Sequence, residues 1–255
     1  MGKLIKYEFI KNRTPLLVSA GVFMASELLF LFGLLFEKEV PCAIGIVLLV
    51  LCSCFIFLIP LIVGITTYTK ELSNKVGFLV YMTPNSSYKI LGSKFIFTTV
   101  MFIAFGALVG VVGISDLLIV KSKFDVPEDF LDIIADILSV FGINLWDSLV
   151  NIFGVLLDVL SALIMYVSLA YVSYTLSATF MQNNKARSFV AGLIFIAGFV
   201  GVIKLLSVLP TVDYAEGINA GSILIASLPV IGASIGVVLV CYAATAYMLD
   251  KKINL

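Results

Sequence analysis

Six long apolar runs dominate this chain of 255 residues. Each run is long enough to cross the hydrocarbon core of a bilayer, which takes about 20 residues of α-helix. Only 13% of the residues are charged, against about 25% in a typical soluble domain. Strands of a membrane barrel would alternate apolar and polar residues, and these runs do not. The sequence therefore predicts an all-α integral membrane protein with spans at 15–36, 41–68, 95–120, 149–180, 189–209 and 223–249.

Lysine and arginine indicate which ends of the spans face the cytoplasm. They concentrate before the first span, between the second and third, between the fourth and fifth, and after the sixth. Cytoplasmic loops contain an excess of these residues. Two predicted spans separate each of these segments from the next, so all four segments lie on the same side of the membrane. We therefore expect both termini in the cytoplasm and a single transmembrane domain over 1–255.

Three segments outside the spans have amphipathic patterns. Segment 1–13 has apolar residues on one helical arc, with Glu8 intruding among them, and is expected to lie on the inner membrane surface. Segment 69–94 has a helical apolar face beginning at Leu72, which would lie either on lipid headgroups or against a partner protein. Segment 121–148 is expected to form an extracellular helix, either floating at the outer leaflet or acting as a lid or acidic docking surface. Its two faces include Phe130, Asp132, Ile133, Asp136 and Ile137.

Several kinds of chemistry are not expected in this chain. It contains no histidine, so His-based metal sites and Ser-His or Cys-His catalysis are excluded. It has no G-x-x-x-x-G-K-[ST] motif with which to hold ATP. The net charge is zero, so nucleic acid is not an expected partner. The four cysteines are interpreted as small apolar residues. We expect no catalytic residue, metal or cofactor in this chain.

Four charged residues lie within the predicted spans: Glu27, Asp116, Asp158 and Lys204. Charges inside a membrane are costly and are often part of a transport path. Glu27 and Lys204 lie at similar depths, so they could form an ion pair that is merely structural. Asp116 could simply reach the surface, whereas Asp158 has no obvious cationic partner. The functional alternative is that these residues line a translocation path.

Four stretches resemble the permease subunits of bacterial ABC type 2 exporters. They are KLIKYEF at 3–9, KEL at 70–72, GFLVYMTP at 77–84 and SYKILGSK at 87–94. In that family, a Gly-aromatic-Leu run is followed by a proline and then by a short motif that opens the third span. The family's spans number six, with both termini in the cytoplasm.

The resemblance implies a transport subunit of the bacterial plasma membrane that pairs with a second permease chain, identical or different. Two copies of a separate ABC ATPase would bind ATP and Mg²⁺ and drive export. The cargo would be amphipathic or hydrophobic, best a peptide toxin or antimicrobial peptide. The alternative is a stand-alone channel or ion-coupled transporter that uses Glu27, Asp158 and Lys204. The residues implied in coupling to the ATPase are Glu71, Leu72, Val76, Gly77, Phe78, Leu79 and Val80, with Lys185 and Arg187 as a lesser contact.

Overall fold

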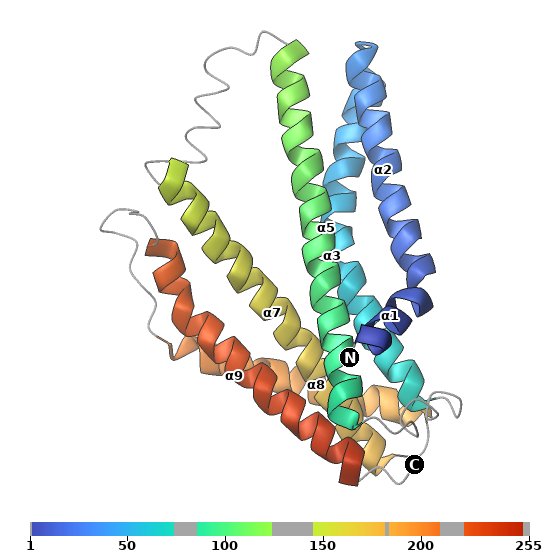
Figure 1. Cartoon of the computed structure of the whole chain (residues 1–255), viewed down its shortest axis with the longest axis vertical. Coiled ribbons are helices and arrows are strands. Elements are labelled where there is room, and N and C mark those ends of the chain that lie inside the picture. The colour runs from blue at the N-terminus through green and yellow to red at the C-terminus, as the bar shows by residue number, and fades with distance from the viewer. Residues whose placement is uncertain (1, 74–85, 124–144, 182–183, 210–221, 252–255) are drawn as a thin grey trace. The chain divides into compact units, whose positions relative to one another are not determined.

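The computed structural model describes residues 2–73, 86–123, 145–181, 184–209 and 222–251 (Figure 1). In this part of the chain every regular element is a helix, and six of the helices are long and apolar enough to cross a membrane. The prediction of a helical membrane protein with six spans is confirmed to that extent. The helices are α1 (Gly2–Lys11), α2 (Arg13–Leu35), α3 (Glu39–Ser73), α5 (Ser87–Lys123), α7 (Leu145–Phe180), α8 (Asn184–Ser207) and α9 (Ser222–Lys251).

Several helices continue beyond the apolar runs from which they were predicted. Helix α3 ends at Ser73, so Leu72 belongs to its last turn rather than to a separate amphipathic helix. Helix α5 already begins at Ser87, and α8 begins at Asn184, so 184–187, which precede the predicted span at 189–209, form the first turn of α8. Hydropathy reports where lipid begins, whereas a helix ends only where caps or breakers interrupt its hydrogen bonds.

The chain divides into two compact units, 1–117 and 118–255. The single transmembrane domain over 1–255 stays a prediction. Unit 1 contains α1, α2, α3 and most of α5. Helices α2 and α3 form an antiparallel hairpin, and α5 runs alongside it (Figure 1). Unit 2 contains α7, α8 and α9, with α7 packed on both of the others.

A tight turn joins α2 to α3 in unit 1. Glu37 adopts a left-handed backbone conformation with φ of 51°, and the Lys38 N–H donates to the Gly33 carbonyl over 2.9 Å. This is the Schellman arrangement that ends many helices, usually with glycine in the left-handed position. Beyond the turn the backbones lie very close, because a Cβ placed on Gly45 would lie 2.5 Å from the Phe30 Cα.

The core of unit 1 lies where three helices meet. It consists of Leu16 and Phe23 from α2, Ile56 and Val63 from α3, and Phe97, Met101 and Phe105 from α5. The ring of Phe9 on α1 meets that of Phe97 edge to face, with centroids 4.9 Å apart. Helix α1 is therefore anchored to the base of unit 1, defined here as the end where α1, the last turns of α3 and the first turns of α5 meet.

Unit 2 is organised around α7. Met165 and Leu169 pack with Val202 of α8, and α9 closes the cluster. Gly154 allows α9 to approach closely, since a Cβ there would lie 2.9 Å from the Leu224 Cα. The fully buried Asn151 accepts a hydrogen bond of 3.2 Å from the Ile223 N–H at the start of α9. One of the amide groups that every helix leaves unpaired at its N-terminus is thereby satisfied from a neighbouring helix.

Candidate functional site

Four charged side chains form a buried ionic cluster at the base of unit 1. The Lys94 ammonium lies 2.6 Å from Glu8 Oε1 and 2.8 Å from Glu71 Oε2. Lys11 pairs with the other oxygen of Glu71 over 2.5 Å. The Lys94 side chain is 2% exposed and the two glutamates about as little, whereas Lys11 is 32% exposed. Two cations and two carboxylates thus neutralise one another, as buried charges require.

The cluster draws on three helices that are distant in sequence. Glu8 and Lys11 come from α1, Glu71 from the last turn of α3, and Lys94 from the second turn of α5. Because Lys94 bridges both glutamates, it links α3 to α5 and each of them to α1. Both helices that flank 74–85 are therefore held against the N-terminal helix by charge.

A second set of polar contacts supports the cluster. Asn12, between α1 and α2, donates its side-chain N–H to the Glu8 carbonyl over 3.0 Å. Its amide oxygen accepts a hydrogen bond of 3.0 Å from the Thr67 hydroxyl on α3. Both Asn12 and Thr67 are buried. The junction between α1 and α2 is thus fixed to α3 independently of the ion pairs.

The structure explains why Glu8 interrupts the apolar arc of α1. Its side chain points into unit 1 toward Lys94, while Lys3 and Lys6 on the same helix are exposed. A charged residue among inward-facing apolar positions was the one signal in the sequence that pointed to this cluster. Lys11, Asn12 and Lys94 were not singled out, because nothing local shows that their distant partners converge.

The predicted coupling residues fall into two groups. Glu71 and Leu72 are 3% and 1% exposed, so both face into unit 1 and anchor the end of α3 rather than present a free surface. The remaining five, Val76, Gly77, Phe78, Leu79 and Val80, lie outside the described residues. The outer-helix residues Phe130, Asp132, Ile133, Asp136 and Ile137 also lie outside them.

The two basic residues predicted as a lesser contact lie in the first turn of α8. Arg187 donates two hydrogen bonds, of 3.2 and 3.1 Å, to the carbonyl oxygen of Met181 just beyond the end of α7. The guanidinium thereby satisfies one of the unpaired carbonyl groups at a helix C-terminus. Arg187 thus helps to fix the connection from α7 to α8, and Lys185 lies on the same turn.

The four charges predicted within the spans occupy different surroundings. Glu27 is 5% exposed, and its carboxyl group lies within hydrogen-bonding reach of that of Asp116 on α5, which is half-buried. Asp158 is half-buried on α7, and Lys204 is exposed on α8. Glu27 and Lys204 belong to different units, so their pairing stays a prediction. The association of Glu27 with Asp116 was not anticipated.

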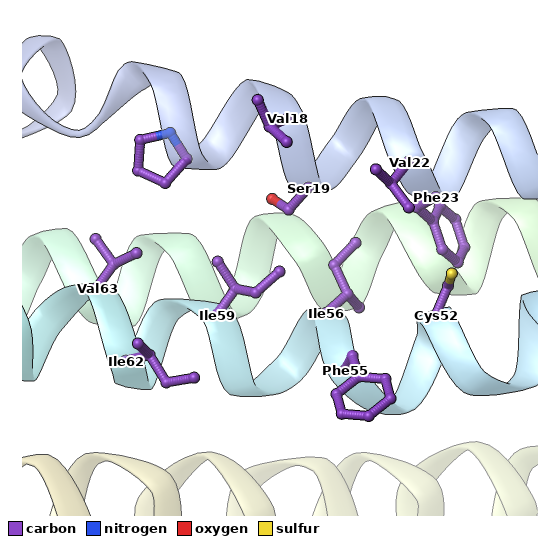
Figure 2. Close-up of a pocket in the computed structure, with 11 residues that line it drawn as sticks. Val18, Ser19, Val22, Phe23, Cys52, Phe55, Ile56, Ile59, Ile62 and Val63 are labelled. Atoms are coloured by element: carbon purple, nitrogen blue, oxygen red, sulfur yellow. The ribbon is translucent and has the colours of Figure 1, made fainter.

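An open apolar groove of about 420 Å³ runs between α2 and α3 (Figure 2). Its lining is aliphatic and aromatic apart from Ser19 and Cys52, and the Ser19 hydroxyl donates to the Leu16 carbonyl of its own helix. The groove therefore offers no spare polar group, and its chemistry suits a hydrocarbon chain. It is lined by Pro15, Val18, Ser19, Val22, Phe23, Cys52, Phe55, Ile56, Ile59, Ile62 and Val63.

Comparisons of this chain with protein-family models, with curated proteins and with solved structures give no match. In the described part of the chain, no three His, Cys, Asp or Glu side chains are grouped so as to hold a metal ion. Function must therefore be inferred from the ionic cluster, the carboxyl pair and the helices that position them.

Proposed function

We propose that this chain is the membrane-spanning permease subunit of an ATP-driven ABC exporter in a bacterial plasma membrane. ATP and Mg²⁺ would be bound by a separate ATPase, two copies of which would act on a pair of permease chains. The cargo would be an amphipathic or hydrophobic molecule, best a peptide. The six apolar helices and the apolar groove are compatible with such a cargo.

The observation that most supports this proposal is the ionic cluster at the base of unit 1. Glu8, Glu71 and Lys94 each come from a different one of the stretches that resemble exporter permeases, 3–9, 70–72 and 87–94. A segment that transmits force from an ATPase needs both of its ends fixed to the transmembrane helices. The cluster provides this for 74–85, because Glu71 and Lys94 stand on either side of it and are joined through one ammonium group.

The side of the membrane also supports the proposal. Lysine and arginine are enriched in the segments that adjoin the base of unit 1, as expected for cytoplasmic loops. Residues 74–85 would then face the compartment that contains ATP. In this interpretation Glu71 and Leu72 position the segment, and direct contact with the ATPase falls to 76–80.

Co-purification tests the proposal. The full chain would be tagged, extracted from its native membranes in mild detergent, and examined for an associated protein with a P-loop and for ATP hydrolysis. Leu79→Glu should abolish the association, whereas Lys38→Glu, an exposed change at the turn between α2 and α3, should not. Arg187→Ala should weaken the association without abolishing it. Purification without any ATPase, from membranes in which transport is active, would refute the proposal.

The second candidate is a stand-alone channel or ion-coupled transporter. The paired carboxyl groups of Glu27 and Asp116 favour it, because ionisable groups inside spans often bind the coupling ion. Asp158 and Lys204 would be further elements of that path. Transport by the purified chain alone in vesicles, driven by an ion gradient and without ATP, would establish this function instead.

A further inference from the structure

We propose that Glu27 and Asp116 form a proton-binding site within the spans of unit 1, in which the two carboxyl groups hold one proton between them. The proposal does not depend on whether the chain works with an ATPase. It rests on three observations: the lack of an ion pair to either residue among the described side chains, the burial of Glu27, and the close approach of two groups that are both acceptors when ionised.

Among the described side chains, no lysine or arginine forms an ion pair with Glu27 or Asp116. Glu27 is the only charged residue within 14–36 of the sequence, Asp116 is the only one within 95–120, and 40–69 contains none. Helix α3, which packs on α2, has its charged residues only in its first and last turns, Glu39 at one end and Lys70 and Glu71 at the other. Its other titratable residues are Cys42, Cys52, Cys54 and Tyr68. The charges of the ionic cluster lie at the base of the unit, about 20 Å from Glu27 along α2 at 1.5 Å per residue.

The contacts of the pair require a hydrogen that the chain does not supply. Glu27 is 5% exposed, and its Oε2 atom is buried. No donor group of the described residues reaches that atom or the buried Oδ1 of Asp116. Yet the two carboxyl groups lie within hydrogen-bonding reach of each other. An ionised carboxylate only accepts hydrogen bonds, so a hydrogen bond forms between them only when one of the two groups is protonated.

Electrostatic repulsion also favours one proton for the two carboxyl groups. Two carboxylates in contact, away from water, do not both ionise, because each disfavours the charge on the other. Two neutral carboxylic acids would instead lose the stronger, charge-assisted bond that one carboxylate and one acid form. One shared proton is therefore the favoured state. Its removal would leave two negative charges between α2 and α5 and weaken that helix contact.

The experiment uses the full chain in lipid nanodiscs and a hydrophobic carbodiimide, which reacts with protonated carboxyl groups in apolar surroundings. Labelled positions are located by mass spectrometry across a pH series. We expect labelling at Glu27 or Asp116 at neutral pH, falling as the pH is raised. The exposed Glu37 of the same unit should stay unlabelled and serves as the solvated control.

Partner variants test whether the proton is shared. The amide of Asp116→Asn donates a hydrogen bond permanently, so Glu27 should no longer need a proton, and its labelling at neutral pH should be lost. Glu27→Gln should have the same effect on Asp116. Both amides are nearly isosteric with a carboxylic acid, so the fold should be retained. The infrared carbonyl band of a protonated carboxyl group gives a second readout and should disappear in either variant.

Three results would overturn the proposal. Labelling that is unchanged by the partner substitution would show that the proton is not shared. Labelling that sodium suppresses at constant pH would assign the site to a metal cation rather than a proton. Labelling of Glu27 that appears only in Lys204→Met would show that the lysine of α8, and not a proton, neutralises the carboxylate.

Discussion

Removing the Lys94 ammonium is the most informative perturbation of the ionic cluster. In Lys94→Met the side chain keeps most of its length and apolar surface, so the change acts mainly on charge. Glu8 then loses its only described ion-pair partner, while Glu71 keeps Lys11. The cluster changes from neutral to a net charge of −1 in a place where Lys94 and Glu8 are nearly inaccessible to water.

The expected loss of stability follows from this burial. Removing one partner of a buried ion pair typically costs about 3–5 kcal/mol, because the remaining charge stays buried without compensation. Lys11→Met should cost much less, about 1 kcal/mol or below, since its side chain is partly solvated and Glu71 retains Lys94. Adding Glu8→Gln to Lys94→Met should recover part of the loss, because it removes the carboxylate left unpaired. The two changes should therefore be strongly non-additive.

The free energy of unfolding would be measured by denaturant titration of the purified full chain in mixed micelles, for the wild type, both single lysine variants, Glu8→Gln and the double variant. Two-state transitions with unchanged slopes are needed for the comparison. If Lys94→Met costs no more than Lys11→Met, or if the double variant is simply additive, the cluster is not a buried, mutually compensating unit and the reasoning fails.

Three further predictions concern helix packing and helix ends, and the same unfolding measurement checks each. Gly45→Ala should lower the free energy of unfolding by about 1–3 kcal/mol, because the added Cβ would overlap the backbone of α2. Gly21→Ala has open space at its Cβ and should raise the free energy of unfolding by about 0.5–1 kcal/mol. Equal effects would contradict the close approach of α2 and α3. Glu37→Gly should stabilise by about 1 kcal/mol because the left-handed conformation strains a residue with a Cβ, whereas Glu39→Gly, in the first turn of α3, should not stabilise. Asn151→Leu should cost about 0.5–2 kcal/mol by leaving the Ile223 amide in the first turn of α9 unpaired. Asn151→Asp, which keeps the acceptor, should cost less; the reverse order would contradict the cap.

The helices of this chain could be predicted from sequence because lipid imposes a simple rule. A segment that crosses a bilayer must satisfy its own backbone hydrogen bonds, so a long apolar run is almost always a helix. Helix ends were predicted less well. Leu72 and 184–187 were assigned to separate segments, whereas the structure continues α3 and begins α8 through them. Outside the apolar region, polar residues are compatible with both helix and loop, and hydropathy no longer discriminates.

The candidate site was predicted only in part. Glu27, Asp116 and Glu71 could be singled out because each interrupts a pattern or belongs to a recognisable motif. Their partners could not, since pairing depends on how the helices rotate against one another. Glu27 and Asp116 stand 89 positions apart, and Lys94 and Glu8 stand 86 apart. Lys204 was an equally reasonable partner for Glu27 by depth alone, because depth fixes only one of the three coordinates of a side chain.

The two charged groupings of unit 1 solve the problem of buried charge in different ways. At the base, four opposite charges from three helices neutralise one another within the chain, so the cluster needs nothing from solution. Between α2 and α5, two like groups meet, and only a proton from outside makes the contact favourable. In the arrangement proposed above, the carboxyl pair changes its charge by exchanging a proton with its surroundings. A pH-dependent change in unit 1 should therefore disappear in Glu27→Gln and persist when Lys11 is replaced by methionine.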